Sequence, residues 1–406
     1  MLAGNISDRS LKYNMENTEK EAMATNPKTH LDAETDYDLV RLFCRLASTQ
    51  SPSLFEANVA RYIKEELRRI GVKTYSDKSS KYTKSNTGNI VAVVGKGKPV
   101  LLFVAHMDTV EDGKKQIKPI IKRGVIKSDG STIVGSDDKS GITAMVGALS
   151  RLKGRKDIPR SIFVFSTAEE SGDNGMGISY LKLKEAVDFA FSVDGSDKPG
   201  TFIKKALGFG EFNIKIRGRA AHAASKPEKG ANAIKAAGII IAKLNIGKFK
   251  NGSSLSIAKI SGGGTTSAVV PDGAELNGVV RGFNVSDMRG IRKHIMRVVS
   301  QACIVTGCKY KISFSEKNSA VPFDKPDEKI VALAKLATES AGLRFNLKDL
   351  YSPSEVNALY GMGYNALGMC RGGRNAHSVK EYVEVKEIYE TAKLLTYIIT
   401  MARNIR

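Results

Sequence analysis

Imidazole and acidic side chains stand where four short apolar segments of the chain end. The segments are residues 100–105, 133–135, 161–168 and 189–193. The chemically active side chains at or just beyond their ends are His106, Asp108, Asp137, Glu169, Glu170 and Asp194. Because ligands of open α/β sheets bind at the carboxyl ends of strands, we expect these side chains to meet at one edge of a sheet.

Carboxylates that gather at one edge repel one another unless cations neutralise them. Asp137, Glu170 and Asp194 bring three negative charges, which suit two divalent ions. Together with His106 and a later histidine they mix nitrogen and oxygen ligands, which favours Zn²⁺, with Mn²⁺ or Co²⁺ as alternatives. Two such ions acidify a shared water and polarise a carbonyl. The sequence therefore predicts a hydrolytic centre with two Zn²⁺ ions per subunit.

The positions of the five histidines narrow the choice of the remaining ligand. His377 lies in a loop of the last part of the chain and is the best candidate for the fifth ligand. His222 lies in a different part of the chain and needs another role. Asp108 follows His106 by two residues on the same face of the strand, so we expect it to fix the tautomer of that imidazole.

The pattern of helices and strands predicts an α/β fold with an insertion. Between residues 90 and 207, β-branched runs alternate with helical patterns, which is typical of a mixed, mostly parallel sheet. Residues 208–316 read β-α-β-β-α-β, as in ferredoxin-like modules. We expect residues 35–207 and 317–406 to form the catalytic domain, residues 208–316 an inserted α+β lid domain, and residues 1–34 a flexible tail.

One local motif predicts where a helix begins. Ser53 and Glu56 have the spacing of a capping box, and an apolar helical face follows them. We therefore expect the side chains of these two residues to cap the main chain of that helix.

The chain is strongly basic, but the way its basic residues are distributed argues against a nucleic-acid partner. Lys and Arg number 63 and Asp and Glu 42, so the formal net charge is 63 − 42 = +21. The basic residues are spread along the chain, and the densest pairs, at 114–115 and 204–205, lack interleaved aromatic residues. A lysine-rich surface that favours solubility explains the charge.

Neither a membrane nor an oxidising compartment is expected. No apolar run approaches the ~20 residues that span a bilayer. The cysteines are too few and too scattered for a disulfide framework, which favours a reducing, cytoplasmic compartment. They are Cys44, Cys303, Cys308 and Cys370.

Five motifs in order resemble those of the di-zinc exopeptidases, the family that includes peptidase T, carboxypeptidase G and acetylornithine deacetylase. The motifs are H-M-D-T at 106–109, S-D-D-K-S-G at 136–141, A-E-E-S-G at 168–172, V-D-G at 193–195 and N-A-H at 375–377. Residues 117–141 and 219–234 are most similar to the peptidase T-like branch. The resemblance covers roughly residues 36–400.

This resemblance implies a division of the ligands between two zinc ions. His106 and Asp194 would hold one ion, Glu170 and His377 the other, and Asp137 would bridge them. In the family the bridging aspartate is followed by a cis peptide, which here would join residues 137 and 138.

The resemblance also implies roles in catalysis and substrate binding. Glu169 would be the general base, and His222 of the lid would reach across a homodimer to stabilise the oxyanion. Arg281 would grip a carboxylate of a short peptide substrate, and Asn357 would be a further substrate contact. The dimer would form through the lid domain.

Three segments depart from the family pattern, and all three concern the choice of substrate. Residues 268–271 read A-V-V-P in place of N-I-V-P, residues 352–357 read S-P-S-E-V-N in place of G-G-x-D-A-N, and residues 222–224 read H-A-A in place of H-A-G. We expect an aminopeptidase that acts on tripeptides. The alternatives are a carboxypeptidase or N-acyl amino acid deacylase and, in another class, a non-catalytic protein that binds peptides or polyanions.

Overall fold

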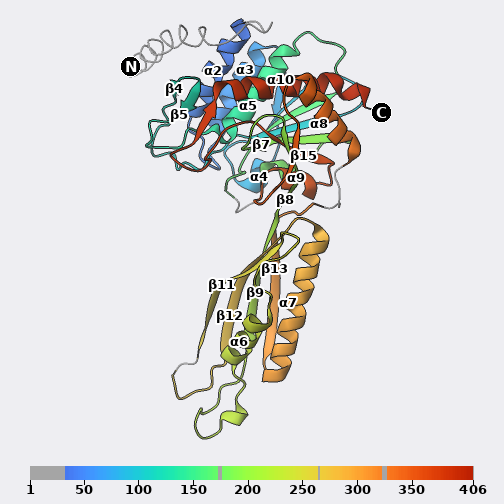
Figure 1. The fold of residues 1–406 in the computed structure, drawn as a ribbon. Helices are drawn as coiled ribbons and strands as arrows, with labels where there is room; N and C mark the ends of the chain where they lie inside the picture. The colour runs from blue at the N-terminus through green and yellow to red at the C-terminus, as the bar shows by residue number, and fades with distance from the viewer. Residues whose placement is uncertain (1–32, 172–175, 264–265, 322–326, 406) are drawn as a thin grey trace. The chain divides into compact units, whose positions relative to one another are not determined.

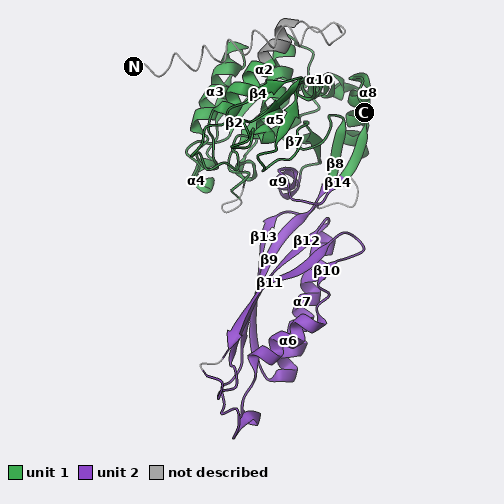
Figure 2. Cartoon of the chain, turned by 60° about the vertical axis from the view of Figure 1, so that its left-hand side comes forward, with its two compact units in different colours: residues 1–204, 326–348, 364–406 green, residues 205–325, 349–363 purple. Residues whose placement is uncertain are grey.

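The computed structural model describes residues 33–171, 176–263, 266–321 and 327–405. The chain divides into two compact units, which Figure 2 colours separately. Unit 1 comprises Met1–Lys204, Pro326–Lys348 and Tyr364–Arg406, and unit 2 comprises Lys205–Lys325 and Asp349–Gly363. The tail expected over residues 1–34 falls almost wholly outside the described residues.

Residues 349–363 belong to unit 2, although we expected them in the first domain. They include helix α9 (Val356–Gly361), which packs against strand β13 (Lys309–Asn318) of the same unit. The sequence pattern of this segment resembles the helices of the first domain, so its partner could not be read from periodicity. The roles of the two units remain predictions.

An eight-stranded sheet forms the centre of unit 1, in the order β1-β2-β6-β3-β7-β15-β8-β14. Figure 1 labels three of its strands, β7, β15 and β8. Its four central strands are parallel: β6 (Ser161–Ser166), β3 (Leu101–His106), β7 (Phe189–Gly195) and β15 (Ala366–Cys370). The flanking strands are β1 (Thr74–Ser76), β2 (Ile90–Val94), β8 (Thr201–Ala206) and β14 (Asn346–Leu350). The pairs β1–β2, β2–β6 and β15–β8 are antiparallel. The expected α/β fold with a mixed sheet is confirmed.

The central strands are buried on both faces, which explains their nearly continuous apolar sequences. All six residues of β3 and all six of β6 are buried. The Phe103 ring stacks on Phe163 and Phe191, with ring centroids 5.1 and 5.5 Å apart. Because β3, β6 and β7 run parallel, the residues that end them meet at one edge of the sheet.

Helix α5 (Ser136–Arg151) brings a further acidic segment to the sheet, since it packs on β3 and β7. Helices α2 (Ala33–Ser48) and α10 (Val385–Met401) pack on α5, and α8 (Glu328–Ser340) packs on α10 (Figure 1). The first turn of α5 departs from helical geometry at Asp137 and Asp138. The peptide between these two residues is cis, as the family resemblance implied.

The predicted capping box is wrong. Helix α3 (Ala57–Arg69) begins after Glu56, whose side chain makes no cap bond to it. The buried Glu56 carboxylate instead accepts hydrogen bonds from the Ala168 main chain at 2.9 Å and from Ser85 Oγ at 2.5 Å. Ser53 Oγ donates to Asp108 Oδ2 at 2.7 Å. Glu56 keeps one local bond, from the Leu54 main-chain nitrogen at 3.1 Å, but its other partners and that of Ser53 Oγ are distant in sequence.

The smaller elements of unit 1 surround this sheet. A three-stranded sheet joins β16 (Tyr382–Glu384), β5 (Val125–Lys127) and β4 (Ile120–Lys122). The short helices are α4 (Ser80–Thr83), η1 (Gly177–Tyr180) and η3 (Ala402–Asn404).

Unit 2 has the expected β-α-β-β-α-β order with one additional two-residue strand, β10, and the ferredoxin-like prediction is confirmed. Its strands are β9 (Gly208–Arg217), β10 (Gly247–Lys248), β11 (Ser254–Gly263), β12 (Gly273–Gly282) and β13, arranged antiparallel as β10-β11-β12-β9-β13. Its helices are η2 (Pro227–Lys229), α6 (Ala233–Lys243) and α7 (Val285–Thr306), besides α9. Alternate residues of β9 and β12 are buried, and α6 and α7 share one apolar core with them.

Two findings bear on the surroundings of the protein. Within the described part of the chain, no helix combines the length and the apolarity needed to cross a membrane. The four cysteines are free thiols, three of them buried.

Candidate metal centre

Three groups of imidazole and carboxylate side chains gather where the central strands of unit 1 end. Within each group, one ligand atom of every residue lies within 4.8 Å of the others. The groups are His106 with Asp137 and Asp194, Asp137 with Glu170 and His377, and His106 with Glu169 and Glu170. Asp137 belongs to the first two groups, which is the arrangement that a shared ligand of two ions requires.

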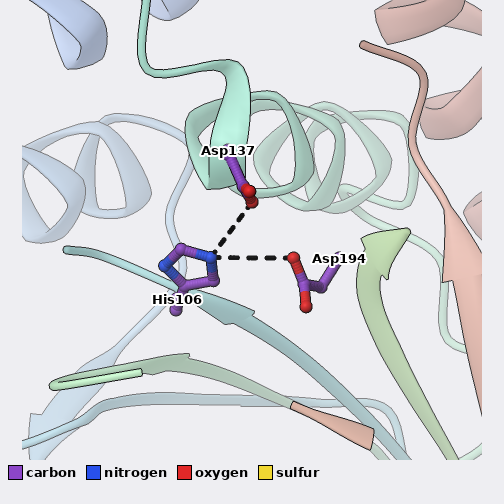
Figure 3. A group of neighbouring side chains, drawn as sticks. All are labelled: His106, Asp137 and Asp194. Carbon is purple, nitrogen blue, oxygen red and sulfur yellow. Dashed lines mark hydrogen bonds and ion pairs between the residues drawn. The ribbon is translucent and has the colours of Figure 1, made fainter. Parts of the chain in front are cut away.

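The first group surrounds one nitrogen of His106. The Nε2 atom of this imidazole lies 3.2 Å from Asp137 Oδ1 and 3.6 Å from Asp194 Oδ1, and Figure 3 shows both carboxylates pointing toward it. The other nitrogen, Nδ1, lies 3.1 Å from the Asp108 main-chain oxygen and 3.5 Å from Asp108 Oδ1. A proton on Nδ1 satisfies these oxygens and leaves Nε2 free to act as a ligand.

The second group uses the other oxygen of the shared aspartate. His377 Nε2 lies 2.8 Å from Glu170 Oε1 and 3.3 Å from Asp137 Oδ2. Hydrogen bonds raise the pKa of His377 to about 10, the bond to Asp137 contributing most and the bond to Glu170 next. The two oxygens of Asp137 thus face different groups, one toward His106 and one toward His377.

The electrostatics of the first group call for a cation. Desolvation would lower the pKa of the buried His106, yet contacts with Asp108, Asp137 and Asp194 raise it well above the usual value. An imidazole held by so many carboxylates occupies a strongly negative site. Two imidazole nitrogens and three carboxylates form the mixed ligand set that divalent zinc, manganese or cobalt accepts, so the side chains fit two metal ions.

Asp108 connects the two kinds of functional side chain. Its carboxylate accepts hydrogen bonds from the main-chain nitrogens of Glu169 at 3.0 Å and Glu170 at 2.9 Å. It also accepts the Ser53 hydroxyl and lies beside Nδ1 of His106. One buried carboxylate therefore orients the imidazole and the two adjacent glutamates together.

Glu169 is part of the metal centre's surroundings but belongs to neither of the two groups that share Asp137. One oxygen of its carboxylate lies within 4.8 Å of a candidate ligand atom of His106 and of Glu170. Desolvation, together with the charges of Asp194, Glu170 and Asp108, raises the pKa of Glu169 well above the usual value for a glutamate. Carboxylates with a strongly perturbed pKa recur in catalytic sites.

Sequence reasoning missed Glu381, which holds the turn that carries the shared aspartate. Its buried carboxylate accepts main-chain hydrogen bonds from Val134 at 2.9 Å, Gly135 at 2.7 Å and Asp137 at 3.0 Å. It also accepts the Ser136 hydroxyl at 2.7 Å. The signal available in the sequence was its position four residues after His377.

Two buried cations were also missed. Lys139 Nζ donates to Ser51 Oγ at 2.7 Å and to the Met107 main-chain oxygen, and burial lowers the pKa of this lysine to about 8. Arg371 contacts the Asp137 and Asp138 carboxylates. Both side chains are buried, and neither residue was given a role from the sequence.

Three predicted residues belong to unit 2. His222 is exposed, and its Nδ1 accepts main-chain hydrogen bonds from Ala224 and Ser225, both at 3.2 Å. The Arg281 guanidinium lies over the Phe209 ring, 5.3 Å from its centroid.

Asn357, the third, is buried and bonded to the main chain. Its Oδ1 accepts from Ser354 at 2.8 Å, and its Nδ2 donates to the Ser319 oxygen at 2.7 Å. Weaker bonds at 3.3 Å reach the oxygens of Ala206 and Leu207. We therefore propose a structural role for Asn357 in place of the expected substrate contact.

Comparisons with known proteins agree with this geometry. Residues 102–401 match the model of the peptidase family M20/M25/M40. Bacillus subtilis YqjE is 26% identical over 367 residues, which cover 90% of this chain and 98% of YqjE.

Two solved structures share the fold over most of their length. An aminopeptidase PepT from Bacillus cereus has a TM-score of 0.81 and 28% identity, covering 91% of this chain and 99% of that one. A tripeptidase from Staphylococcus aureus has a TM-score of 0.78 and 26% identity, with the same coverage.

The Glu381 contacts generate a prediction about metal binding. Glu381→Gln replaces one of the two acceptor oxygens by an amide nitrogen, so the turn that holds Asp137 loses main-chain hydrogen bonds. We expect the affinity for Zn²⁺ to fall by about 10–100-fold, the usual effect of losing such a supporting contact. Competition with a chromophoric chelator measures the change, and the exposed Glu328→Gln is the control. Unchanged affinity in Glu381→Gln would show that the turn holds Asp137 without this carboxylate.

Proposed function

The chain belongs to peptidase family M20/M25/M40 and is a metallo-exopeptidase, and we propose that it is a dinuclear zinc aminopeptidase acting on tripeptides. The observation that supports the dinuclear centre most directly is the Asp137 carboxylate, whose two oxygens face two separate groups of ligands. The similarity to an aminopeptidase and a tripeptidase supports the substrate class.

The residues of unit 1 divide naturally between two ions. His106 and Asp194 would hold one ion, Glu170 and His377 would hold the other, and Asp137 would contact both. When bound, the metals would polarise the scissile carbonyl and make a water more acidic.

Glu169 is the proposed general base. Its main-chain hydrogen bond to Asp108 fixes it next to the ligand Glu170, and its carboxylate lies within 4.8 Å of the His106 ligand atom. In the ionised form it would take a proton from the attacking water and deliver it to the leaving amine.

His222 is the proposed donor to the oxyanion. Because its Nδ1 accepts two main-chain N–H groups, the neutral ring carries its proton on Nε2. The residue is exposed in the single chain, so Nε2 is available to a substrate held by a second subunit. This reading includes a homodimer formed through unit 2.

Arg281 is the proposed anchor for the substrate carboxylate. Its guanidinium is partly exposed and is steadied by the Phe209 ring beneath it. A planar fork of donors binds a carboxylate with two parallel hydrogen bonds. An anchor for the C-terminus would give the enzyme its preference for short peptides. We also propose a cytoplasmic location, in which the free thiols would remain reduced.

Removing the general base should abolish turnover without removing the metals. Glu169→Gln keeps the shape of the side chain but cannot accept the proton. We expect kcat on a tripeptide to fall by about 10²–10⁴-fold, while Zn²⁺ content measured by mass spectrometry stays at the wild-type value. Glu65→Gln, on the exposed face of α3, should behave as wild type. Wild-type kcat in Glu169→Gln would exclude this residue as the base.

Blocking one end of the substrate identifies the terminus that the enzyme needs. An aminopeptidase should not cleave an N-acetylated tripeptide. It should still cleave the same tripeptide with an amidated C-terminus, at a raised KM because Arg281 loses its partner. The unmodified tripeptide is the control. Cleavage of the acetylated peptide but not of the amidated one would favour the carboxypeptidase or deacylase alternative.

The action of His222 across subunits can be tested by mixing two inactive variants. His222→Ala and Glu169→Gln should each be inactive alone. After subunit exchange, a mixed dimer contains one site with both an intact Glu169 and an intact His222. We expect about a quarter of wild-type activity for random exchange of equal amounts. If the dimer forms in light scattering but mixing restores nothing, His222 does not act in trans.

A further inference from the structure

A buried arginine contacts the shared aspartate of the metal centre. Arg371 directly follows strand β15 and is 0% exposed. Its Nη2 lies 2.5 Å from Asp137 Oδ1 and 3.9 Å from Asp194 Oδ1, and its Nε lies 2.6 Å from Asp138 Oδ1. The guanidinium therefore joins carboxylates of two consecutive residues and reaches toward a third.

The surrounding main chain fixes this arginine in place. Its main-chain nitrogen donates to the Gly195 oxygen at 2.9 Å, next to the paired ends of β15 and β7. Its Nη1 donates to the Gly372 oxygen at 2.9 Å. A Cβ atom on Gly373 would lie 2.9 Å from Nη1, so the chain passes close to the guanidinium. Arg371 thus has little room to move away when another cation approaches.

The contact is asymmetric between the two groups of ligands. Arg371 Nη2 contacts Oδ1 of Asp137, the same oxygen that faces His106 Nε2 at 3.2 Å. The other oxygen, Oδ2, faces His377 Nε2 at 3.3 Å. A permanent positive charge therefore lies on the His106 side of the shared carboxylate, where it competes for the same lone pairs and repels a metal ion.

We propose that the guanidinium of Arg371 places a permanent positive charge against Asp137 when the metals bind. The ion held by His106 and Asp194 then binds more weakly than the ion held by Glu170 and His377. The inference rests on the proposed function, because it requires a centre for two metals. The enzyme would keep one ion tightly and exchange the other, and its activity would follow the supply of divalent metal through the weaker site.

Arg371 also has a structural contact, which the experiment must separate from its effect on metals. Asp138 is buried, and its Oδ2 accepts the His106 main-chain nitrogen at 3.2 Å. Losing its arginine partner would remove a close countercharge of this carboxylate. A purely structural loss would weaken both metal sites together and leave the ratio of their affinities unchanged. The proposed role predicts that the two affinities become more similar.

The test is a calorimetric titration of the metal-free protein with ZnCl₂, with Co²⁺ absorption spectra as a second readout. The wild type should bind two ions with dissociation constants that differ by about tenfold or more, as a nearby unit charge implies. Arg371→Gln removes the charge but can still donate hydrogen bonds, and it should tighten the weaker phase until the gap narrows. Arg371→Lys keeps the charge and the gap, and the exposed Arg61→Gln is the control.

Ligand variants assign the two phases without altering Arg371, in case its variants do not fold. His377→Ala should remove the tighter phase, and His106→Ala should remove the weaker one. The opposite assignment would overturn the inference. The inference would also be overturned if the wild type bound both ions with equal affinity and Arg371→Gln did the same. The dinuclear centre itself would then still stand. Failure of the wild type to bind any metal would overturn the proposed function itself.

Discussion

Burial of negative charge at one edge of a parallel sheet is the constraint on which the centre depends. Carboxylates of Asp108, Asp137, Asp138, Glu169, Glu170 and Asp194 gather there, and two of them, Asp108 and Asp138, are fully buried. Charges removed from water need partners, because their mutual repulsion grows as the dielectric falls. The described structure supplies two of these partners from its own chain, Arg371 and Lys139. Metal ions would supply the rest, so the same excess of charge that opposes folding of this edge favours metal binding.

Two carboxylates outside the ligand groups, those of Asp108 and Glu381, hold the functional loops in place by accepting hydrogen bonds from their main-chain N–H groups. Asp108 accepts from the residues that carry Glu169 and Glu170, and Glu381 accepts from the turn that carries Asp137. Each supporting carboxylate lies close in sequence to a ligand on another strand or loop, two residues from His106 and four from His377. Asp108 therefore connects the strand that carries His106 to the segment that carries Glu169 and Glu170, and Glu381 connects the loop of His377 to the turn of Asp137.

The sequence predicted the parts of this centre that follow from strand direction. Acidic and imidazole residues at the ends of β3, β6 and β7 had to meet once these strands were parallel, and His106, Glu170 and Asp194 do so. Asp137 joins them from the first turn of helix α5. The contacts of Glu381 and Arg371 could not be predicted, because nothing local distinguishes a buried charge from a surface charge. Ser53 and Glu56 show the converse error. Their spacing matched a capping box, but Ser53 Oγ donates to Asp108, and Glu56 accepts from Ala168 and from the nearby Leu54 and makes no cap bond to the helix.

The division of the chain separates two kinds of specificity. Every residue of the three ligand groups belongs to unit 1, whereas His222 and Arg281 belong to unit 2. Metal affinity should therefore depend on the strand ends and on the charges placed around Asp137, while substrate choice should depend on a unit with its own core. The departures from the family pattern at residues 224 and 268–271 lie in unit 2, and none alters a metal-ligand candidate. Such a chain can acquire a different peptide preference while the electrostatic demands of its metal centre, met in part by Arg371, stay unchanged.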